Sequence, residues 1–246
     1  MENNLLFSNF EKFPDVMLAM SLRPDKNMKT YYDFEKDEEA LINRERFLEK
    51  LNLSGKNLVS VKSISAGNIE IVTEKHLGNF IENTDGLITA RKNVYLAITV
   101  ADCLPVIIFD TQKEVIGLLH CGWKGIEKNI IEKAVNKMKD TFDSAPQDIV
   151  AGMGPGIGAC HFEVKEDLME KFTSYPEAFK KEGGKNFMDL KLIAQKKLEK
   201  CGVRPENIAV NPDCTCCRPV KYYTFRRDRT EPLQAMIVVA GIKGNY

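Results

Sequence analysis

The sequence predicts a single α/β domain, residues 1–246, with mixed β-sheets and helices outside them. Short apolar runs rich in β-branched residues recur along the chain and are too short for helices. Amphipathic stretches with helical spacing of apolar residues lie between those runs. No internal repeat or low-complexity linker divides the chain, and 43% hydrophobic content over 246 residues is sufficient for one large core.

The N-terminal third combines strands with one helix. Residues 13–21 predict a strand ending at Arg23-Pro24, and a polar, loop-like stretch follows to residue 38. Apolar residues at helical spacing among charges predict an amphipathic helix over 38–51. Residues 57–64 and 69–73 then predict two strands on either side of the turn-like sequence 65–68.

The centre of the chain is the most apolar part. Strands are predicted over 85–89, 94–100, 106–109 and 115–119. A stripe of apolar residues with lysines and glutamates opposite predicts a helix over 124–141, and we interpret this stripe as core packing.

The C-terminal part begins with a short strand over 148–151 that leads into a glycine-rich run, residues 152–158. A dinucleotide-binding fingerprint would need glycine where Ile157 stands, and Pro155 lacks an amide donor. We therefore expect a tight turn passing close to other backbone. Helices are predicted over 165–172 and 186–200, the second closing at Cys201-Gly202, and strands over 208–210, 220–225 and 235–240.

The charge balance excludes some partners. The chain has 35 basic and 35 acidic residues and a pI of about 6.8, so we expect neither a nucleic-acid groove nor binding to an anionic membrane surface. The N-terminus lacks the features of a secretory signal, and the longest apolar stretch, 94–109, is interrupted by Asp102 and too short to span a bilayer. We expect a soluble, cytoplasmic protein whose partner is a small molecule, present as a monomer or weak homo-oligomer.

Seven cysteines scattered through a domain of this size predict reduced thiols. Cys214, Cys216 and Cys217 cluster in sequence, but a zinc knuckle needs a second pair and only Cys201 lies near, so a zinc knuckle is not the favoured interpretation. His161 could be a ligand, although a helix-entry or core role is preferred.

Asp102 and Cys103 fall between two predicted strands, and His120 follows a third. Cys103 and His120 are seventeen positions apart, enough for a strand, a turn and a strand to bring them together. Thiolate and imidazole suit zinc or copper with a third protein ligand, or the imidazole could activate the thiol as a nucleophile. The alternative is a core cysteine and a core histidine, which the adjoining Asp, Pro, Gly and Trp make less attractive.

Two groups of basic residues are further candidates. Arg226, Arg227 and Arg229 surround Asp228 and could form either a solvated rim or a clamp for an oxyanion. Asn43 and Arg44 lie on the first predicted helix, where a solvated face is the favoured interpretation.

Six motifs in order over residues 85–228 point to a known family. They are Asp85-Gly86-Leu87-Ile88-Thr89, Thr99-Val100-Ala101-Asp102-Cys103-Leu104-Pro105-Val106, His120-Cys121-Gly122-Trp123-Lys124-Gly125, Gly154-Pro155-Gly156-Ile157-Gly158-Ala159-Cys160, Cys214-Thr215 and Tyr223-Thr224-Phe225-Arg226-Arg227-Asp228. With these motifs the chain resembles the laccase-domain family, also called multicopper polyphenol oxidase or peptidoglycan-editing-factor proteins. Some members act as purine nucleoside phosphorylases.

The resemblance implies packed mixed sheets in α/β/β/α layers and a metal, zinc or alternatively copper, held by His, Cys and His. Cys103 and His120 match two of these ligands. Ser63 and Ser65 stand where the family has the Gln and His of a Gln-x-His segment, so His76 would be the third ligand only if the chain folds it back. After Asp228, Arg229 stands where the family usually has glycine.

The implied activity is metal-assisted phosphorolysis of adenosine, inosine or methylthioadenosine with inorganic phosphate as co-substrate, together with adenosine deamination. Arg226 and Arg227 would clamp the phosphate, Asn43 and Arg44 would contribute more weakly, and Asp102 would orient a metal ligand or relay a proton. The alternatives are a Cys–His hydrolase acting on a cell-wall peptide or amide, and a catalytically impaired paralogue that binds a nucleoside. Phenol oxidation is least expected, because three histidines cannot ligate several coppers.

Overall fold

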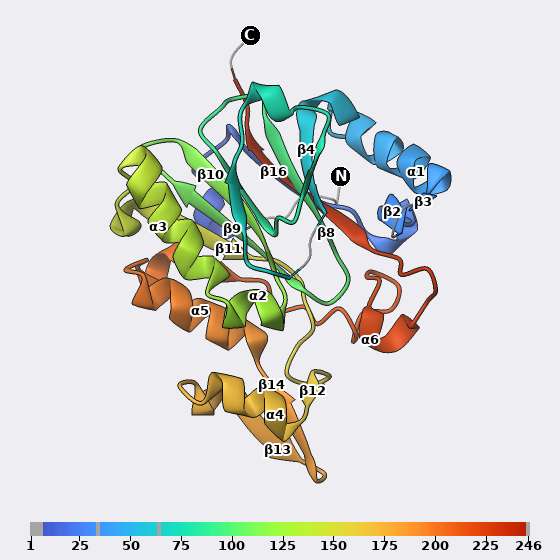
Figure 1. The fold of residues 1–246 in the computed structure, drawn as a ribbon, viewed down its shortest axis with the longest axis vertical. Helices are drawn as coiled ribbons and strands as arrows, with labels where there is room; N and C mark the ends of the chain where they lie inside the picture. The colour runs from blue at the N-terminus through green and yellow to red at the C-terminus, as the bar shows by residue number, and fades with distance from the viewer. Residues whose placement is uncertain (1–6, 33–34, 63–64, 245–246) are drawn as a thin grey trace.

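Two β-sheets packed face to face form the centre of the computed structural model, which describes residues 7–32, 35–62 and 65–244 (Figure 1). The first sheet has five strands in the order β1 (Val16–Met20), β16 (Met236–Ile242), β8 (Tyr95–Val100), β4 (Leu58–Lys62) and β6 (Phe80–Glu82). The second has six strands in the order β15 (Ile208–Val210), β11 (Ile149–Met153), β9 (Leu104–Asp110), β10 (Val115–Cys121), β7 (Gly86–Thr89) and β5 (Ile69–Ile71). Both sheets mix parallel and antiparallel pairs.

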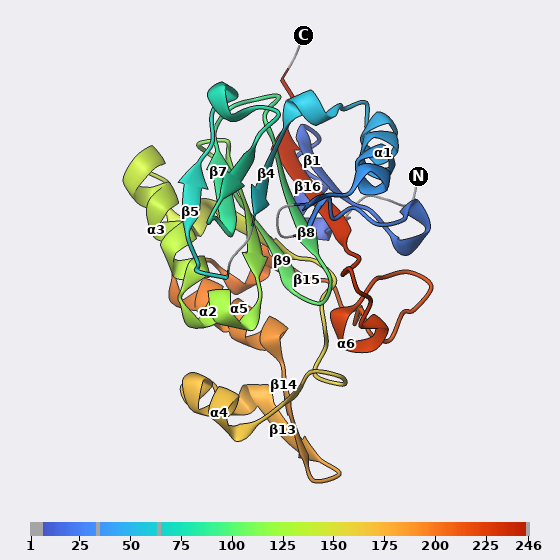
Figure 2. The ribbon, with the colours of Figure 1, turned by 45° about the vertical axis from the view of Figure 1, so that its right-hand side comes forward.

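Helices cover the outer faces of both sheets, as Figures 1 and 2 show. The helix α1 (Glu38–Glu49) packs Phe47 and Leu48 against the five-stranded sheet. On the other side α3 (Ile130–Phe142) and α5 (Leu190–Lys200) cover the six-stranded sheet. The remaining helices are α2 (Trp123–Glu127), α4 (Glu166–Met169) and α6 (Phe225–Asp228). The predicted α/β/β/α layers are therefore confirmed.

The core between the sheets explains the continuous apolar runs in the sequence. Ile98 of β8 and Ile107 of β9 meet in this core, while Ala97 faces the layer of α1 and Ile108 faces the layer of α3 and α5. A strand buried on both faces needs apolar residues at successive positions, since neighbouring side chains point to opposite sides. The strands predicted over 94–100, 106–109 and 115–119 are β8, β9 and β10.

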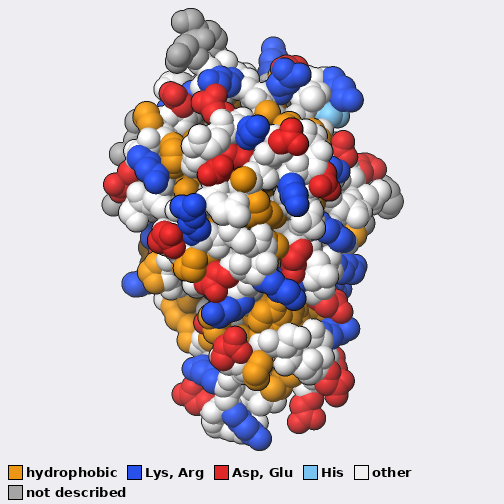
Figure 3. All heavy atoms as spheres, turned by 90° about the vertical axis from the view of Figure 1, so that its left-hand side faces the viewer, with side chains coloured by type: hydrophobic (Ala, Val, Ile, Leu, Met, Phe, Trp, Pro, Cys, Tyr) orange, Lys and Arg blue, Asp and Glu red, His pale blue; other side chains and the backbone are white. Residues whose placement is uncertain are grey.

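Two small sheets complete the fold. A three-stranded sheet of β12 (Glu163–Val164), β14 (Lys185–Met188) and β13 (Phe179–Glu182) projects with α4 from one end of the molecule (Figure 1). A two-stranded sheet of β2 (Tyr31–Tyr32) and β3 (Glu35–Lys36) precedes α1, in the stretch predicted to be a loop. Basic and acidic side chains are interspersed on the face drawn in Figure 3. No helix of the described residues is long and apolar enough to cross a bilayer.

Three predicted elements differ from the structure. The helix predicted over 124–141 is broken into α2 and α3, because Asn129 takes a left-handed backbone conformation with φ of 61°. The helix predicted over 186–200 begins only at Leu190, where Asp189 caps it, and β14 occupies the residues before it. The strand predicted over 220–225 is absent: Tyr222 and Tyr223 are both buried in an irregular segment, so their side chains do not alternate as in a strand.

The connections between the two sheets matter most for function. Strands β4 and β5 flank the turn-like residues 65–68, but they belong to different sheets and do not pair. In the same way β8 and β9 are consecutive along the chain and lie in different sheets. Asp102 and Cys103 therefore stand where the chain crosses from one sheet to the other.

Candidate active site

The crossover between β8 and β9 is held in an unusual backbone conformation at Asp102, whose φ is 88°. Thr215 donates its hydroxyl to Oδ1 of Asp102 at 2.6 Å, and the backbone N–H of Arg226 donates to Oδ2 at 2.7 Å. These bonds compensate the strain of a positive φ in a residue with a side chain. Both carboxylate oxygens thus tie the crossover to the C-terminal loops.

The strand pair β9–β10 brings Cys103 and His120 to the same end of one hairpin. Their register pairs Leu104 with Cys121 and Pro105 with His120, so the predicted return by strand, turn and strand is confirmed. Gly122 lies against the sulfur, where a Cβ at this position would come within 2.9 Å of Cys103 Sγ. A glycine is therefore required for this close approach.

Burial controls the ionisation of this pair. It raises the pKa of the Cys103 thiol to about 12, with further contributions from the negative charges of Asp102 and Asp85. Burial also lowers the pKa of His120, an effect that Asp85 partly opposes. At neutral pH the site consequently contains a protonated thiol and an uncharged imidazole.

Asp85 itself is fully buried beside the pair and fixes the neighbouring turn. Its carboxylate accepts hydrogen bonds from the backbone N–H groups of Ser65, Ala66 and Gly67 at 2.7 to 2.8 Å. Its backbone carbonyl accepts the N–H of His120 at 2.8 Å. One residue thus connects the 65–67 turn with the end of β10.

A cavity of about 710 Å³ opens over Cys103 and His120. Its aromatic lining comes from Tyr31, Phe80, Trp123, Phe162 and Phe225, and Ser65 also lines it. Among the described residues the charged side chains that line it are four basic ones and one acidic one: Lys29, Arg44, Lys62, Arg226 and Asp102. Because the carboxylate of Asp102 is already hydrogen-bonded, the cavity offers a positive environment in a protein of zero formal charge.

Arg44 is the most unusual of these basic residues. It is buried at 6% exposure, so the expected solvated face for Arg44 and Asn43 is wrong; both lie on the packed face of α1. Its Nη1 donates to Ser60 and its Nη2 to the carbonyl of Met28, while Nε has no described partner. No described carboxylate lies within ion-pair distance of it. Burial lowers its pKa to about 10, which leaves it charged at neutral pH.

The two adjacent arginines of the C-terminal motif have different environments. Arg226 lines the cavity, stands 5.8 Å from the Phe162 ring and donates to the carbonyl of Glu163 at 3.2 Å. Arg227 instead points into the protein, where it binds Asp228 and the carbonyls of residues 215, 216 and 222. Asn43 donates to the carbonyl of Asn27 and does not line the cavity.

The sequence pattern of the family described as "Multi-copper polyphenol oxidoreductase laccase" matches residues 25–240. The chain belongs to this family. It is 29% identical over 224 residues to purine nucleoside phosphorylase YlmD of Bacillus subtilis, covering 86% of this chain and 81% of that one. It is 34% identical over 155 residues to a purine nucleoside phosphorylase of Aquifex aeolicus, covering 63% of this chain and 70% of that one.

Solved structures that resemble this chain have the same fold. The hypothetical protein YfiH of Bacillus licheniformis superimposes with a TM-score of 0.89 at 26% identity, covering 99% of this chain and 97% of that one. YlmD of Geobacillus stearothermophilus superimposes with a TM-score of 0.88 at 24% identity, covering 95% and 94% of the two chains. The second comparison supports the fold alone.

The third ligand of the family's metal is not found beside Cys103 and His120. Ser65, where the resemblance places a histidine, lines the cavity with a φ of 57°, and Ser63 lies outside the described residues. His76 sits in a 3-10 helix beyond β5 and accepts a hydrogen bond on Nδ1 from the N–H of Thr73. This helix follows the end of β5 next to Thr89, whereas His120 lies near the Gly86 end of β7.

The donor set at Cys103 and His120 therefore does not fit a catalytic metal centre, which needs three protein ligands. No third histidine, cysteine or carboxylate among the described residues joins the pair as a possible ligand. The chain's three histidines lie apart in the fold, so they cannot build a multicopper centre either.

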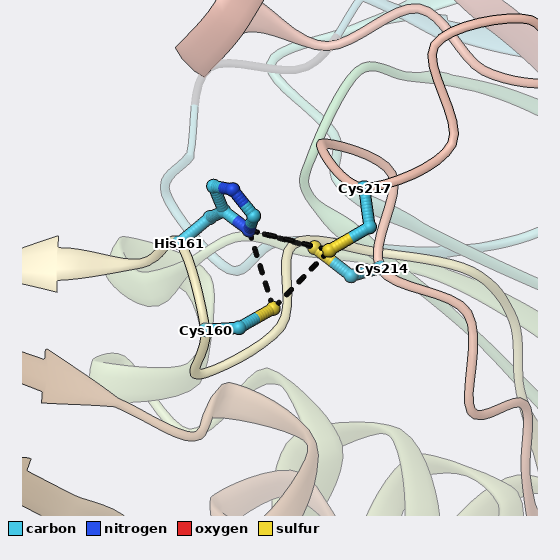
Figure 4. A group of neighbouring side chains, drawn as sticks. All are labelled: Cys160, His161, Cys214 and Cys217. Atoms are coloured by element: carbon cyan, nitrogen blue, oxygen red, sulfur yellow. Dashed lines mark hydrogen bonds between the residues drawn. The ribbon is translucent and has the colours of Figure 1, made fainter.

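A different group of donors does come together, at the surface. Cys160, His161, Cys214 and Cys217 have ligand atoms within 4.8 Å of one another (Figure 4). His161 is exposed and lies in a turn that leads into the strand β12, so the expected helix-entry or core role is wrong. Cys160 and His161 supply the second pair of possible metal ligands beside Cys214 and Cys217. Cys201 does not belong to this group. A Cys-His dipeptide and a Cys-x-x-Cys pair in one chain are the signal that could have indicated this group.

Proposed function

We propose that this laccase-domain protein catalyses phosphorolysis of a purine nucleoside in the cavity above Cys103 and His120. The observation that carries the proposal is the buried guanidinium of Arg44, which faces the cavity without a described carboxylate partner. The names of the related purine nucleoside phosphorylases support the same reaction. All seven cysteines are free thiols, which is consistent with the cytoplasm as the proposed compartment.

The phosphate would bind at the basic end of the cavity. Arg44 is charged and shielded from water, and a guanidinium presents donors matched to a phosphate group. Arg226 supplies a second guanidinium at the cavity wall, and its backbone is fixed through Asp102. Arg227 is not part of this proposed clamp, because its donors already bind Asp228 and three carbonyls.

The purine would bind against the aromatic wall. Trp123, Phe162 and Phe225 offer flat apolar surfaces to an aromatic base, and Phe225 is 62% exposed and accessible at the rim. At the inner end, the neutral imidazole of His120 and the protonated thiol of Cys103 can hydrogen-bond to the base. Adenosine, inosine and methylthioadenosine are the proposed substrates.

In the reaction the bond between the anomeric carbon of ribose and the base nitrogen breaks, and its electron pair goes to the base. An oxygen of hydrogen phosphate forms the new bond to that carbon, and the proton that hydrogen phosphate loses ends on the base, giving free base and ribose 1-phosphate. The phosphate held by Arg44 and Arg226 balances the positive charge that develops on the sugar. His120 would hydrogen-bond to the base nitrogen as negative charge develops there.

Metal-assisted steps, including adenosine deamination, are not part of the proposed mechanism. Cys103 and His120 supply two donors where such chemistry needs three protein ligands and an activated water. Deamination is nevertheless measured in the same assay, because it converts adenosine to inosine without consuming phosphate.

The test is to incubate the purified protein with each nucleoside with and without phosphate, and to quantify free base and ribose 1-phosphate. We expect both products in equal amounts only when phosphate is present. Arg44→Met should lower kcat/KM for phosphate by about 100-fold or more, because the substitution removes the buried positive charge that binds the phosphate. Arg46→Met, on the exposed side of the same helix, is the matched control and should stay within about twofold of wild type.

Three results would contradict the proposal. Saturable nucleoside binding by calorimetry without turnover would indicate a catalytically impaired paralogue. Turnover of a cell-wall amide with inactivation on alkylation of Cys103 would indicate a hydrolase, although a thiol with a pKa of about 12 is a poor nucleophile. Unchanged phosphate dependence in Arg44→Met together with Arg226→Ala would place the phosphate elsewhere.

A further inference from the structure

We propose that Cys160, His161, Cys214 and Cys217 bind one zinc ion in a closed, four-coordinate structural site. This site is separate from Cys103 and His120, and the inference does not depend on the proposed phosphorolysis. Figure 4 shows the four side chains converging from two loops, with the imidazole and the three sulfurs directed at a common point.

The distances between donor atoms match a tetrahedral zinc site. His161 Nδ1 lies 3.2, 3.3 and 3.9 Å from the sulfurs of Cys160, Cys217 and Cys214, and the sulfurs of Cys160 and Cys217 are 3.5 Å apart. With metal–sulfur and metal–nitrogen distances of about 2.3 and 2.1 Å, the corners of a tetrahedron are roughly 3.6 to 3.8 Å apart. Small side-chain adjustments would therefore complete the coordination.

The backbone of the two loops is already fixed around this point. Gly156 forms a β-bridge with Cys214, and the N–H of Gly158 donates to Cys214 Sγ at 3.2 Å. A Cβ at Gly158 would lie 3.1 Å from the Cβ of Cys214 and 3.3 Å from Cys160 Sγ, so this glycine allows the loops to approach. Donors held in place before metal binding lower the entropy cost of closing the site.

The donor set selects zinc and a structural role. Three thiolates and one imidazole are soft to borderline ligands that favour zinc over magnesium or calcium. Four protein ligands leave no open position for a substrate or an activated water, as in structural rather than catalytic zinc sites. Cys160, His161 and Cys217 are exposed, so the ion can enter from solvent.

The position of the site gives the zinc a function in the fold. One loop continues from Cys160 to Phe162, which lines the cavity and whose ring centre lies 5.8 Å from the guanidinium carbon of Arg226. The other continues from Cys214 to Thr215, which donates to the carboxylate of Asp102. A zinc ion clamping the two loops would therefore stabilise one wall of the cavity and the crossover that carries Cys103.

Zinc content of the purified full chain tests the proposal. We expect about one zinc per chain by elemental mass spectrometry, retained in Cys103→Ala and reduced at least tenfold in Cys217→Ser. Cys216→Ser and Cys201→Ser are matched controls, since both cysteines lie outside the four donors, and they should retain the metal. His161→Cys should also retain it, because a fourth thiolate replaces the imidazole.

Cobalt substitution tests the ligand set independently of folding yield. The charge-transfer absorption from sulfur to cobalt should fall by about one third in each single cysteine variant of the site and stay unchanged in Cys103→Ala. Zinc that remains in Cys217→Ser, zinc that disappears in Cys103→Ala, or a Cys160–Cys217 disulfide in place of bound metal would each overturn the proposal.

Discussion

Cys103 and His120 at the cavity, and the four donors Cys160, His161, Cys214 and Cys217 at the surface, use the same chemistry in different surroundings. The cavity pair extends from two paired strands and is half-buried, and desolvation keeps the thiol protonated and the imidazole neutral. The surface group comes from two loops, has four donors and is largely exposed. A thiol must lose its proton to bind a metal, and the resulting thiolate charge is costly where it is shielded from water. Metal binding is therefore easier at the exposed surface group than at the cavity pair.

The difference teaches that the most conspicuous motif in this sequence need not mark its best metal site. Metal affinity follows the number and preorganisation of donors, and the surface group exceeds the cavity pair in both. The cavity instead combines uncharged hydrogen-bonding groups with buried positive charge, which suits an anionic substrate. The two regions are joined by the hydrogen bond that the Thr215 hydroxyl donates to the carboxylate of Asp102.

Restoring the missing ligand should produce the largest change in metal binding. Ser65→His places an imidazole at the cavity wall beside Cys103 and His120, and histidine tolerates the left-handed conformation with φ of 57° that Ser65 has. We expect zinc content to rise from about one to about two per chain, with the affinity of the cavity for zinc rising on the order of 100-fold or more.

Ser65→Asn is the control for this substitution, because asparagine also tolerates the conformation and carries no imidazole. Calorimetric zinc titration of both variants in the Cys217→Ser background isolates the cavity site. Equal zinc binding by the two variants would show that the third ligand is not what the cavity pair lacks.

Among the effects on folding stability, removal of the carboxylate of Asp85 should be the largest. Asp85→Ala leaves three backbone N–H groups of residues 65–67 without their acceptor and should lower the free energy of unfolding by about 4 kcal/mol. It should also impair nucleoside turnover, since the turn lines the cavity. Urea denaturation and the phosphorolysis assay measure the two effects.

Asp110→Ala provides the comparison for Asp85→Ala. Asp110 is also fully buried and accepts two backbone N–H bonds, from Gln112 and Lys113, but it does not line the cavity. It should cost stability and leave kcat/KM of the folded fraction near that of wild type. A similar loss of activity in both variants would indicate a general effect of destabilisation.

The layers of the fold could be predicted because the sequence pattern follows directly from burial. Strands β8, β9 and β10 are buried on both faces, so their residues form apolar runs that can be recognised in the sequence. The break between α2 and α3 could not be predicted from the apolar stripe, since it continues through Asn129. Only the backbone conformation at that residue shows the interruption.

The roles of the arginines could not be predicted from residue type. Arg226 and Arg227 are adjacent and chemically identical, and the orientation of the short helix α6 decides which one reaches the cavity. Likewise, a helical pattern shows that α1 is amphipathic but not that Arg44 lies on its buried side. The zinc ligands come from segments more than fifty residues apart, and only the meeting of two loops brings them together.

A smaller effect is expected at Gly122. Gly122→Ala puts a methyl group within 2.9 Å of Cys103 Sγ, so the sulfur or the backbone must move. Overpacking of this kind should cost about 2 kcal/mol and lower kcat/KM by roughly tenfold. In a Cys103→Ala background the same substitution should cost less than about 0.5 kcal/mol, because the sulfur is gone. A double-mutant cycle by urea denaturation measures the coupling, and equal costs in both backgrounds would contradict the contact.

The smallest effect concerns pH. Burial lowers the pKa of His120 below its ordinary value near 6.5, so on acidification the unfolded chain takes up this proton before the folded protein does. Stability contributed by the neutral imidazole is therefore present above the unfolded pKa and is lost as pH falls through and below it. Between pH 7.5 and 5.5 wild type should lose more stability than His120→Gln, measured as the difference between their urea curves.

Cys103→Ala is the control for the pH measurement, since a thiol with a pKa of about 12 does not titrate in this range. Its pH dependence should match wild type even though it also alters the cavity. Zinc release on acidification would affect all three proteins alike and cancels in the differences. If wild type loses no more stability than His120→Gln, His120 must bind its proton as well in the folded protein as in the unfolded chain. That result would contradict the neutral imidazole assigned to the cavity.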